Sequence, residues 1–191
     1  MSKARLQSSR RAPAAVVVFA IAAAAGLTAH QARPAAPPAA APGPVLVFDT
    51  VKGTFQMQMF AADAPKSVDH LIGLVKQNFY RGLRFHRVEA RLVQIGDPQT
   101  RNVALKEMWG TGNSGHPIGV SEVSRKHLHV RGAVGLAHSG SPQYADSQFY
   151  IMKAADTSLD GKYCVVGQVT SGMEVVDKLE VGDVLRQVTI K

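Results

Sequence analysis

Cysteine and long hydrophobic runs are the clearest shortages in this 191-residue chain. The single cysteine, Cys164, permits no internal disulfide and excludes a C-x-x-C redox or zinc site. It lies in an apolar run, which indicates a buried structural thiol rather than a nucleophile. Apart from one shorter run near the N-terminus, no segment approaches the ~20 apolar residues of a membrane-spanning helix. Because 46% of the residues are hydrophobic, wholesale disorder is excluded and one globular domain is expected.

Acidic residues are missing from the first 44 positions, although the whole chain has 14 of them. From Val45 onward 17 basic residues face these 14 acidic ones, so the net charge there is +3 of a total of +8. Total charge alone favours a nucleic-acid-binding domain, a hypothesis that salt-dependent binding would test. Because the basic residues of the body are dispersed among acidic ones, we expect no nucleic-acid partner.

The basic, acid-free N-terminus is typical of a targeting segment. Four basic residues precede a small or apolar run from Ala12 to Leu27, as in a secretory signal. We expect residues 1–29 to be a signal peptide or an uncleaved membrane anchor, with a mitochondrial transit peptide as the rival interpretation. Residues 30–44 are predicted to be a Pro/Ala-rich linker. We therefore expect an exported protein, periplasmic or anchored with its domain outside the cytoplasm, that meets the membrane only through its N-terminal segment.

Alternation of apolar and polar residues begins at Val45 and indicates strands. Two strands flank Lys52-Gly53, which predicts a hairpin. Apolar residues at helical spacing after Pro65 predict a helix that ends near Asn78. The remaining expected elements are strands at 92–95, 133–137, 148–152, 164–169 and 184–190, and a short helix at 173–179. Many short strands with few helices predict a mainly β domain, an antiparallel sandwich or barrel.

Two candidate motifs are interpreted as structural. Residues 110–115 match G-x-G-x-x-G, but no apolar strand precedes them and Pro117 prevents an immediate helix. We therefore expect a surface loop rather than a phosphate site. His127 and His129 could place two imidazoles on one strand face, yet no third ligand accompanies them. They are interpreted as surface or loop histidines, and neither a metal nor a cofactor is expected.

Four sequence blocks occur in an order and at spacings that resemble a known family. They read FHRV at 85–88, QIGDP at 94–98, DSQFYI at 146–151 and LDGKY at 159–163. This combination resembles the cyclophilin family of peptidyl-prolyl cis-trans isomerases over residues 45–191. The resemblance implies a closed eight-stranded antiparallel β-barrel capped by two α-helices, with the active site on the outside of the barrel. It also implies proline-containing polypeptides as substrates, without a cofactor.

Isomerisation of an X-Pro bond requires a group that weakens amide resonance. The barrier of ~18–20 kcal/mol exists because the nitrogen donates its lone pair into the carbonyl. A cation that hydrogen-bonds the prolyl nitrogen as it becomes pyramidal stabilises the twisted state more than either planar state. The resemblance assigns this role to Arg87, with Gln94 holding the arginine and the substrate. It assigns substrate contacts to Phe85, Leu92, Ala137, His138, Gln148, Tyr150, Leu159 and Tyr163.

Departures from the family pattern affect the expected activity. The chain is one residue shorter between Arg87 and Asp97, and Leu92 replaces the phenylalanine of the pocket. We therefore expect a monomeric isomerase, less active than typical members, that assists the folding of exported proteins. The alternative is a non-catalytic cyclophilin-like module that binds proline peptides, or a chaperone. Ser158 stands where the family has the tryptophan that contacts cyclosporin, so weak cyclosporin binding is expected.

Overall fold

The structure is a computed structural model that describes residues 43–191. Within this range the eight strands are β1 (Val45–Thr50), β2 (Gly53–Met59), β3 (Arg87–Val88), β4 (Leu92–Ile95), β5 (Ala133–Leu136), β6 (Phe149–Met152), β7 (Val165–Ser171) and β8 (Leu185–Ile190). In the same range the helices are α1 (Pro65–Lys76) and α2 (Met173–Asp177), with 3₁₀ turns η1 (Pro98–Arg101), η2 (Val103–Met108), η3 (Pro142–Tyr144) and η4 (Thr157–Leu159). The predicted signal or anchor lies outside the described residues, as does the linker except for Gly43 and Pro44. No helix within residues 43–191 has the length and apolar character to cross a bilayer.

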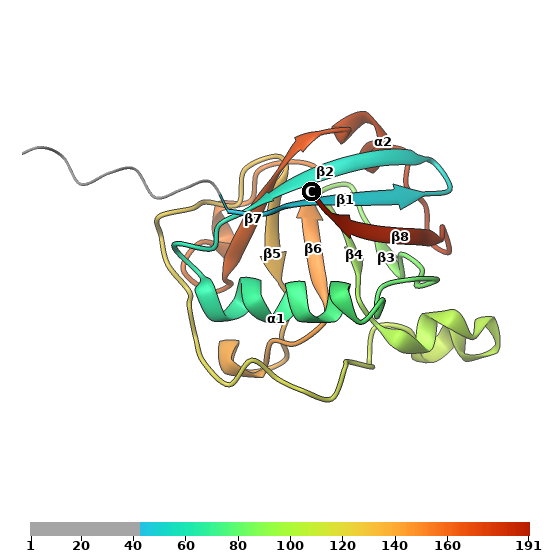
Figure 1. Ribbon diagram of the computed structural model, residues 1–191, viewed down its shortest axis with the longest axis horizontal. Coiled ribbons are helices and arrows are strands. Elements are labelled where there is room, and N and C mark those ends of the chain that lie inside the picture. The colour runs from blue at the N-terminus through green and yellow to red at the C-terminus, as the bar shows by residue number, and fades with distance from the viewer. Residues whose placement is uncertain (1–42) are drawn as a thin grey trace, which may run out of the picture. The chain divides into compact units, whose positions relative to one another are not determined.

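The predicted strands and helices are found in the predicted order, and the structure adds β3, which no sequence pattern predicted. β1 and β2 form a hairpin whose register ends with Thr50 opposite Gly53. α1 begins with Pro65 and stops two residues before Asn78, which adopts a positive φ of 56°. α2 is shorter than expected, because it ends at Asp177 rather than at residue 179. Figure 1 shows the two α-helices at opposite sides of the strands.

The strands form one curled antiparallel sheet in the order β3-β4-β6-β5-β7-β2-β1-β8. Its two edge strands share no ladder. Instead, the segment just ahead of β3 meets the start of β8 through an isolated bridge between Arg84 and Val184. The N–H of Gly82 also donates to the carbonyl of Leu185 at 2.8 Å. The prediction of a closed barrel is therefore slightly overstated, because only a few backbone hydrogen bonds join the two edges of the sheet.

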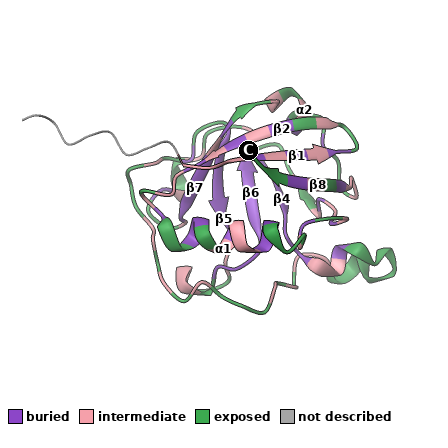
Figure 2. Cartoon of the chain, in the orientation of Figure 1, coloured by how far each residue is buried: buried purple, intermediate pink, exposed green. Residues whose placement is uncertain are grey.

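Apolar side chains fill the inside of the curled sheet. The rings of Phe48 and Phe55 stack at 4.8 Å, and Phe149 meets Phe48 edge to face at 5.9 Å. Phe149 is 2% exposed and belongs to the core. Figure 2 shows the central strands β5 and β6 as buried and the η1–η2 segment as largely exposed. Side chains on the outer face of the strands are thus the ones available to a ligand.

The glycine-rich loop at 110–115 wraps around two buried carboxylates. Asp97 accepts N–H bonds from Gly110 and Gly112 at 2.6 and 3.1 Å, and Asp146 accepts one from Gly115 at 3.0 Å. A Cβ at Gly112 would lie 2.4 Å from Oδ1 of Asp97. The predicted loop is confirmed. Close packing against Asp97 explains Gly112, whereas Gly110 and Gly115 have positive φ values of 94° and 87°, which favour glycine.

Candidate active site

One row of residues crosses four neighbouring strands on the outer face of the sheet. Arg87 on β3 lies opposite Gln94 on β4, Gln94 lies opposite Tyr150 on β6, and Tyr150 lies opposite Gly135 on β5. Residues that face each other in paired strands project to the same side of a sheet. Because Val93 packs in the core, its neighbour Gln94 and the whole row face outward. The pairing register thus brings together three predicted site residues that are distant in sequence.

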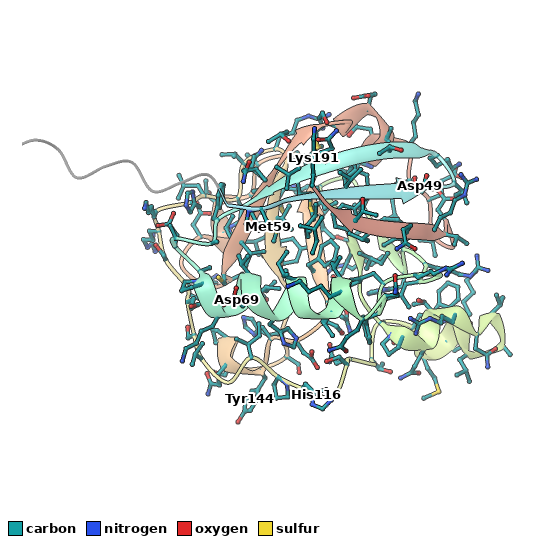
Figure 3. All side chains as sticks on the ribbon, in the orientation of Figure 1. Asp49, Met59, Asp69, His116, Tyr144 and Lys191 are labelled. Atoms are coloured by element: carbon teal, nitrogen blue, oxygen red, sulfur yellow. The ribbon has the colours of Figure 1, made fainter. Side chains whose placement is uncertain are left out.

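The row borders a cavity of about 440 Å³. Eight of the ten predicted site residues line it: Arg87, Leu92, Gln94, Ala137, His138, Tyr150, Leu159 and Tyr163. An adjoining cavity of about 410 Å³ shares three of these residues and is also lined by Gln148. Its rim includes Tyr144, which is 60% exposed and projects from the lower edge of the molecule in Figure 3. Nine of the ten predicted residues therefore surround two adjoining cavities.

Phe85 is the predicted site residue that lies elsewhere. Its side chain is 0% exposed and packs in the main core. The residue belongs to the segment that joins the two edges of the sheet, where its N–H donates to the carbonyl of Asp183 at 3.1 Å. A ligand outside the sheet cannot reach a side chain that fills the interior. The predicted substrate contact of Phe85 is therefore wrong, and its role is packing.

Arg87 lies at the rim of the first cavity, with its guanidinium held by two side chains. Its Nε and Nη2 donate to the two carboxylate oxygens of Glu89 at 2.7 and 3.1 Å, and its Nη1 donates to Oε1 of Gln94 at 3.3 Å. Glu89 is within reach because it begins the three-residue loop, 89–91, that joins β3 to β4. The Arg87 side chain remains 49% exposed. The bidentate pair orients the cation without burying it.

Gln94 and Gln148 form a bonded pair beside the arginine. Nε2 of Gln94 donates to Oε1 of Gln148 at 2.8 Å. Nε2 of Gln148 donates in turn to the carbonyls of Gly110 and Gly112 at 3.0 and 2.8 Å. Because both amide side chains are buried, these bonds determine how each amide is oriented. A chain of polar contacts thus runs from Arg87 to the glycine-rich loop.

The other side of the cavity is apolar. Leu92 and Tyr150 are 8% and 4% exposed and belong to a small cluster separate from the main core, against which Leu159 and Tyr163 pack. The rings of Tyr150 and Tyr163 meet edge to face at 5.9 Å. Such a wall favours a small apolar side chain, while the cation and amides at the rim can bond peptide oxygen and nitrogen atoms.

His129 is buried, which corrects its interpretation as a surface or loop histidine. It is 2% exposed, whereas its neighbours Leu128 and Val130 are 46% and 48% exposed. Its Nδ1 lies 2.9 Å from Oδ1 of Asp160, and its Nε2 lies 2.9 Å from the hydroxyl of Tyr150. Here the polar residue is inside and the apolar ones are outside, so pattern rules could not identify it. Its partner Asp160 had only one signal, its place in the LDGKY block.

Burial and hydrogen bonding shift several pKa values around the cavity. The backbone N–H of His129, followed by its ring, lowers the pKa of Asp160. Burial raises the pKa of Tyr150, and the nearby Tyr163 adds to the effect. Burial also raises the pKa of Cys164 to about 11, so the buried thiol stays protonated at neutral pH. Among residues 43–191, no three side chains of the metal-binding types come together.

Comparisons with known proteins agree with this geometry. The family described as cyclophilin type peptidyl-prolyl cis-trans isomerase/CLD matches residues 45–191. A peptidyl-prolyl cis-trans isomerase of Helicobacter pylori is 37% identical over 142 residues, which cover 73% of this chain and 82% of the relative. Peptidyl-prolyl cis-trans isomerase B of Bacillus subtilis is 32% identical over 136 residues, which cover 71% and 90%.

The fold is also shared with solved structures. A cyclophilin type peptidyl-prolyl cis-trans isomerase of Cryptosporidium parvum superposes with a TM-score of 0.68 at 20% identity, and the match covers 78% of this chain and 97% of that chain. A second structure of that protein was determined in the presence of the dipeptide Ala-Pro, with a TM-score of 0.67 at 20% identity over 77% and 98% of the two chains. The family and enzyme class predicted from the sequence are confirmed. The chain belongs to the cyclophilin-type peptidyl-prolyl cis-trans isomerase family.

Proposed function

We propose that this protein accelerates the isomerisation of X-Pro bonds in polypeptides, and that Arg87 stabilises the twisted amide. The observation that supports the proposal is a guanidinium held at the rim of a cavity whose other side is apolar. The proline ring of a substrate would occupy the apolar side, against Leu92, Tyr150 and Leu159. Its prolyl nitrogen would then face Arg87.

The contacts of Arg87 leave part of its guanidinium available. A guanidinium has five N–H groups. Glu89 accepts from Nε and from one N–H of Nη2, and Gln94 accepts from one N–H of Nη1. One N–H on each Nη therefore remains at the end of the fork. These two groups can donate to the prolyl nitrogen and to a substrate carbonyl.

Such donation acts selectively on the twisted state. In the planar amide the nitrogen lone pair is delocalised into the carbonyl, so the nitrogen is a poor acceptor. As the bond twists, the lone pair becomes localised and its hydrogen bond to Arg87 strengthens. A thousandfold acceleration requires only about 4 kcal/mol of such differential stabilisation. One oriented hydrogen-bond donor in a site partly shielded from water can supply a stabilisation of this size.

Substitution Arg87→Ala in the full-length chain tests the proposal. We expect kcat/KM for an X-Pro tetrapeptide to fall about 100-fold, the lower end of the effect of removing one positioned donor, because Arg87 is half exposed. Arg186→Ala removes another exposed arginine, 3.8 Å from Asp49 and outside both cavities, and is the matched control. A wild-type protein that does not accelerate isomerisation, or an Arg87→Ala variant as active as wild type, would contradict the proposal.

A non-catalytic module that binds proline peptides, or a chaperone, is the second candidate function. It is favoured by Leu92, which provides a smaller wall than an aromatic ring, and by the shortened β3–β4 hairpin. In that case calorimetry would detect binding of a proline peptide to a wild-type protein that does not accelerate isomerisation. In the catalytic case, Leu92 lowers the activity below that of typical members because it holds the proline ring less tightly.

We also propose that the protein acts on exported proteins outside the cytoplasm, as a monomer. The basis is the sequence of residues 1–29, with their basic start and apolar run, and the proline-rich residues 30–44. N-terminal sequencing of the protein from a cell fraction tests this. A mature chain that begins near residue 30, or an intact chain in the membrane fraction, is expected; an intact chain in the cytoplasmic fraction would contradict export.

Cyclosporin binding is expected to be weak. Ser158, at the position of the tryptophan that contacts cyclosporin in the family, is exposed on η4 and bonds the carboxylate of Asp156. A serine offers far less apolar contact area than a tryptophan. Calorimetry with cyclosporin measures this directly, and tight binding would contradict the expectation.

A further inference from the structure

His129 is a buried residue behind the cavity for which the proposed mechanism has no use. It contributes no atom to the lining of either cavity. Nevertheless its side chain is 0% exposed, and both ring nitrogens have partners, Asp160 at 2.9 Å and Tyr150 at 2.9 Å. Burying an imidazole is costly unless its nitrogens are bonded. The imidazole therefore fixes the positions of two other parts of the molecule, one at Asp160 and one at Tyr150.

The first of these groups is the segment that carries Leu159. The backbone N–H of His129 donates to Oδ1 of Asp160 at 2.8 Å, and its carbonyl accepts from the N–H of Asp156 at 2.9 Å. The segment 156–160 is thus bonded to His129 at both of its ends. Leu159, which lines the cavity, lies inside this segment.

The second group is the Tyr150 ring. Gly135 lies opposite Tyr150 in the β5–β6 pairing, and a Cβ at Gly135 would lie 2.4 Å from both Cζ and the hydroxyl oxygen of Tyr150. The phenol therefore passes directly over a position that has no side chain, and its hydroxyl meets His129. The space above Gly135 and the bond to His129 together determine where the ring lies.

The donors and acceptors in this chain can be assigned. Asp160 is a carboxylate at neutral pH, because hydrogen bonds from His129 lower its pKa. Nδ1 of His129 therefore donates to it, and in the neutral imidazole Nε2 then accepts from the Tyr150 hydroxyl. Tyr150 keeps its proton because burial raises its pKa. The chain runs from Tyr150 through His129 to Asp160, and each proton has one acceptor.

We propose that His129 is a positioning residue of the proline pocket: it ties the Tyr150 wall on β6 to the Leu159 wall on the segment 156–160, and so sets the width between them. The proposal rests on the proposed isomerase function, because it assumes that the proline ring enters between these walls. His129 touches no substrate. Its loss would therefore raise KM more than it lowers kcat, because substrate binding is weakened more than the isomerisation of bound substrate.

A double-mutant cycle tests the proposal in the full-length chain, with kcat and KM measured on an X-Pro tetrapeptide. Tyr150→Phe keeps the ring and removes only the hydroxyl; we expect KM to rise about three- to tenfold, the effect of one hydrogen bond, with kcat within about twofold of wild type. His129→Leu should raise KM by at least as much. His129→Leu also removes the ring's bond to Asp160, so its effect is the upper limit. The double variant should be no worse than His129→Leu alone, because both changes break the same Tyr150–His129 hydrogen bond.

His127→Leu is the matched control, because this neighbouring histidine bonds Asp63 and lines neither cavity. It should leave KM unchanged. If His129→Leu does not fold, Tyr150→Phe still decides, together with the imidazole ¹⁵N shifts of wild type and Tyr150→Phe. Those shifts should show the Nδ1-protonated form in wild type and a changed Nε2 signal in the variant.

An unchanged KM in folded Tyr150→Phe, or additive effects in the double variant, would overturn the positioning role. An inactive wild type would instead contradict the proposed function.

Discussion

The two sides of the cavity are organised in opposite ways. On the polar side, Arg87 and Glu89 form a bidentate pair whose side chains are 49% and 50% exposed. On the apolar side, Tyr150 and His129 form a hydrogen bond between residues that are 4% and 2% exposed. The cation is oriented while it stays hydrated, and the ring is oriented by full burial. In this site the charged group thus remains in contact with water, while the ring that shapes the cavity is held by buried contacts.

Physical chemistry supports that division. A charge taken fully out of water loses several kcal/mol of hydration, which a single partner does not always return. An exposed ion pair avoids this loss but contributes only about 0–1 kcal/mol. A buried hydrogen bond, by contrast, leaves an unsatisfied group that costs about 1–3 kcal/mol when one partner is removed. Breaking a contact on the apolar side should therefore cost more folding stability than breaking the Arg87–Glu89 ion pair.

The largest expected effect follows from Gly135→Ala. The added methyl would lie 2.4 Å from the Tyr150 ring, so the ring must move toward the cavity. We expect urea unfolding to show a loss of about 1–3 kcal/mol and the assay to show a raised KM. The control is Gly73→Ala in α1, where a Cβ would meet nothing within 4 Å; it should gain about 0.5–1 kcal/mol. A Gly135→Ala variant with wild-type stability and KM would show that the Tyr150 ring can move away from the added methyl without cost, and would contradict the prediction.

A smaller effect is expected from Glu89→Ala, which frees Arg87 from its bidentate partner. We expect kcat/KM to fall about threefold at low ionic strength, since an exposed pair contributes at most about 1 kcal/mol. The difference should vanish near 1 M salt, where exposed charges are screened. Glu180→Ala, which breaks the distant pair with Lys52, is the control. An increase in kcat/KM on Glu89→Ala would mean that Glu89 competes with substrate for the guanidinium.

The smallest expected effect is the loss of folding stability at acidic pH that follows from protonation of Asp160. Hydrogen bonds from His129 place the pKa of Asp160 below its ordinary value of 3.8 in the folded protein. The stabilisation is therefore present above pH 3.8 and is lost as the pH falls through the lowered pKa. We expect the stability gap between wild type and Asp160→Asn to close below that pH in urea unfolding. Asp69→Asn, at the exposed position on α1 labelled in Figure 3, is the control. A gap independent of pH would show that Asp160 does not act as a carboxylate.

Much of the site could be predicted because its residues lie in sequence blocks with a clear order. The blocks point to Arg87, Gln94 and Tyr150 without any information on strand pairing, and all three line one cavity. Phe85 was misassigned because a sequence block does not show which side of the chain faces the core. The sequence did not predict a role for Glu89. An acidic residue two positions from an arginine becomes informative only when the backbone conformation shows that the carboxylate lies within hydrogen-bonding distance of the guanidinium.

By itself the amino-acid sequence determined most of the strands and the helix that begins at Pro65, because alternation and proline geometry are local properties. The resemblance of its sequence blocks to the cyclophilin family pointed to Arg87 as the cation. Only the tertiary structure decided that Arg87, Gln94, Tyr150 and Gly135 share one row, because strand register depends on pairing between distant segments. Only the tertiary structure buried His129 between two exposed apolar neighbours, because its partners Asp160 and Tyr150 lie 31 and 21 residues away along the chain. Burial of a polar group depends on such partners, and a local pattern does not contain them.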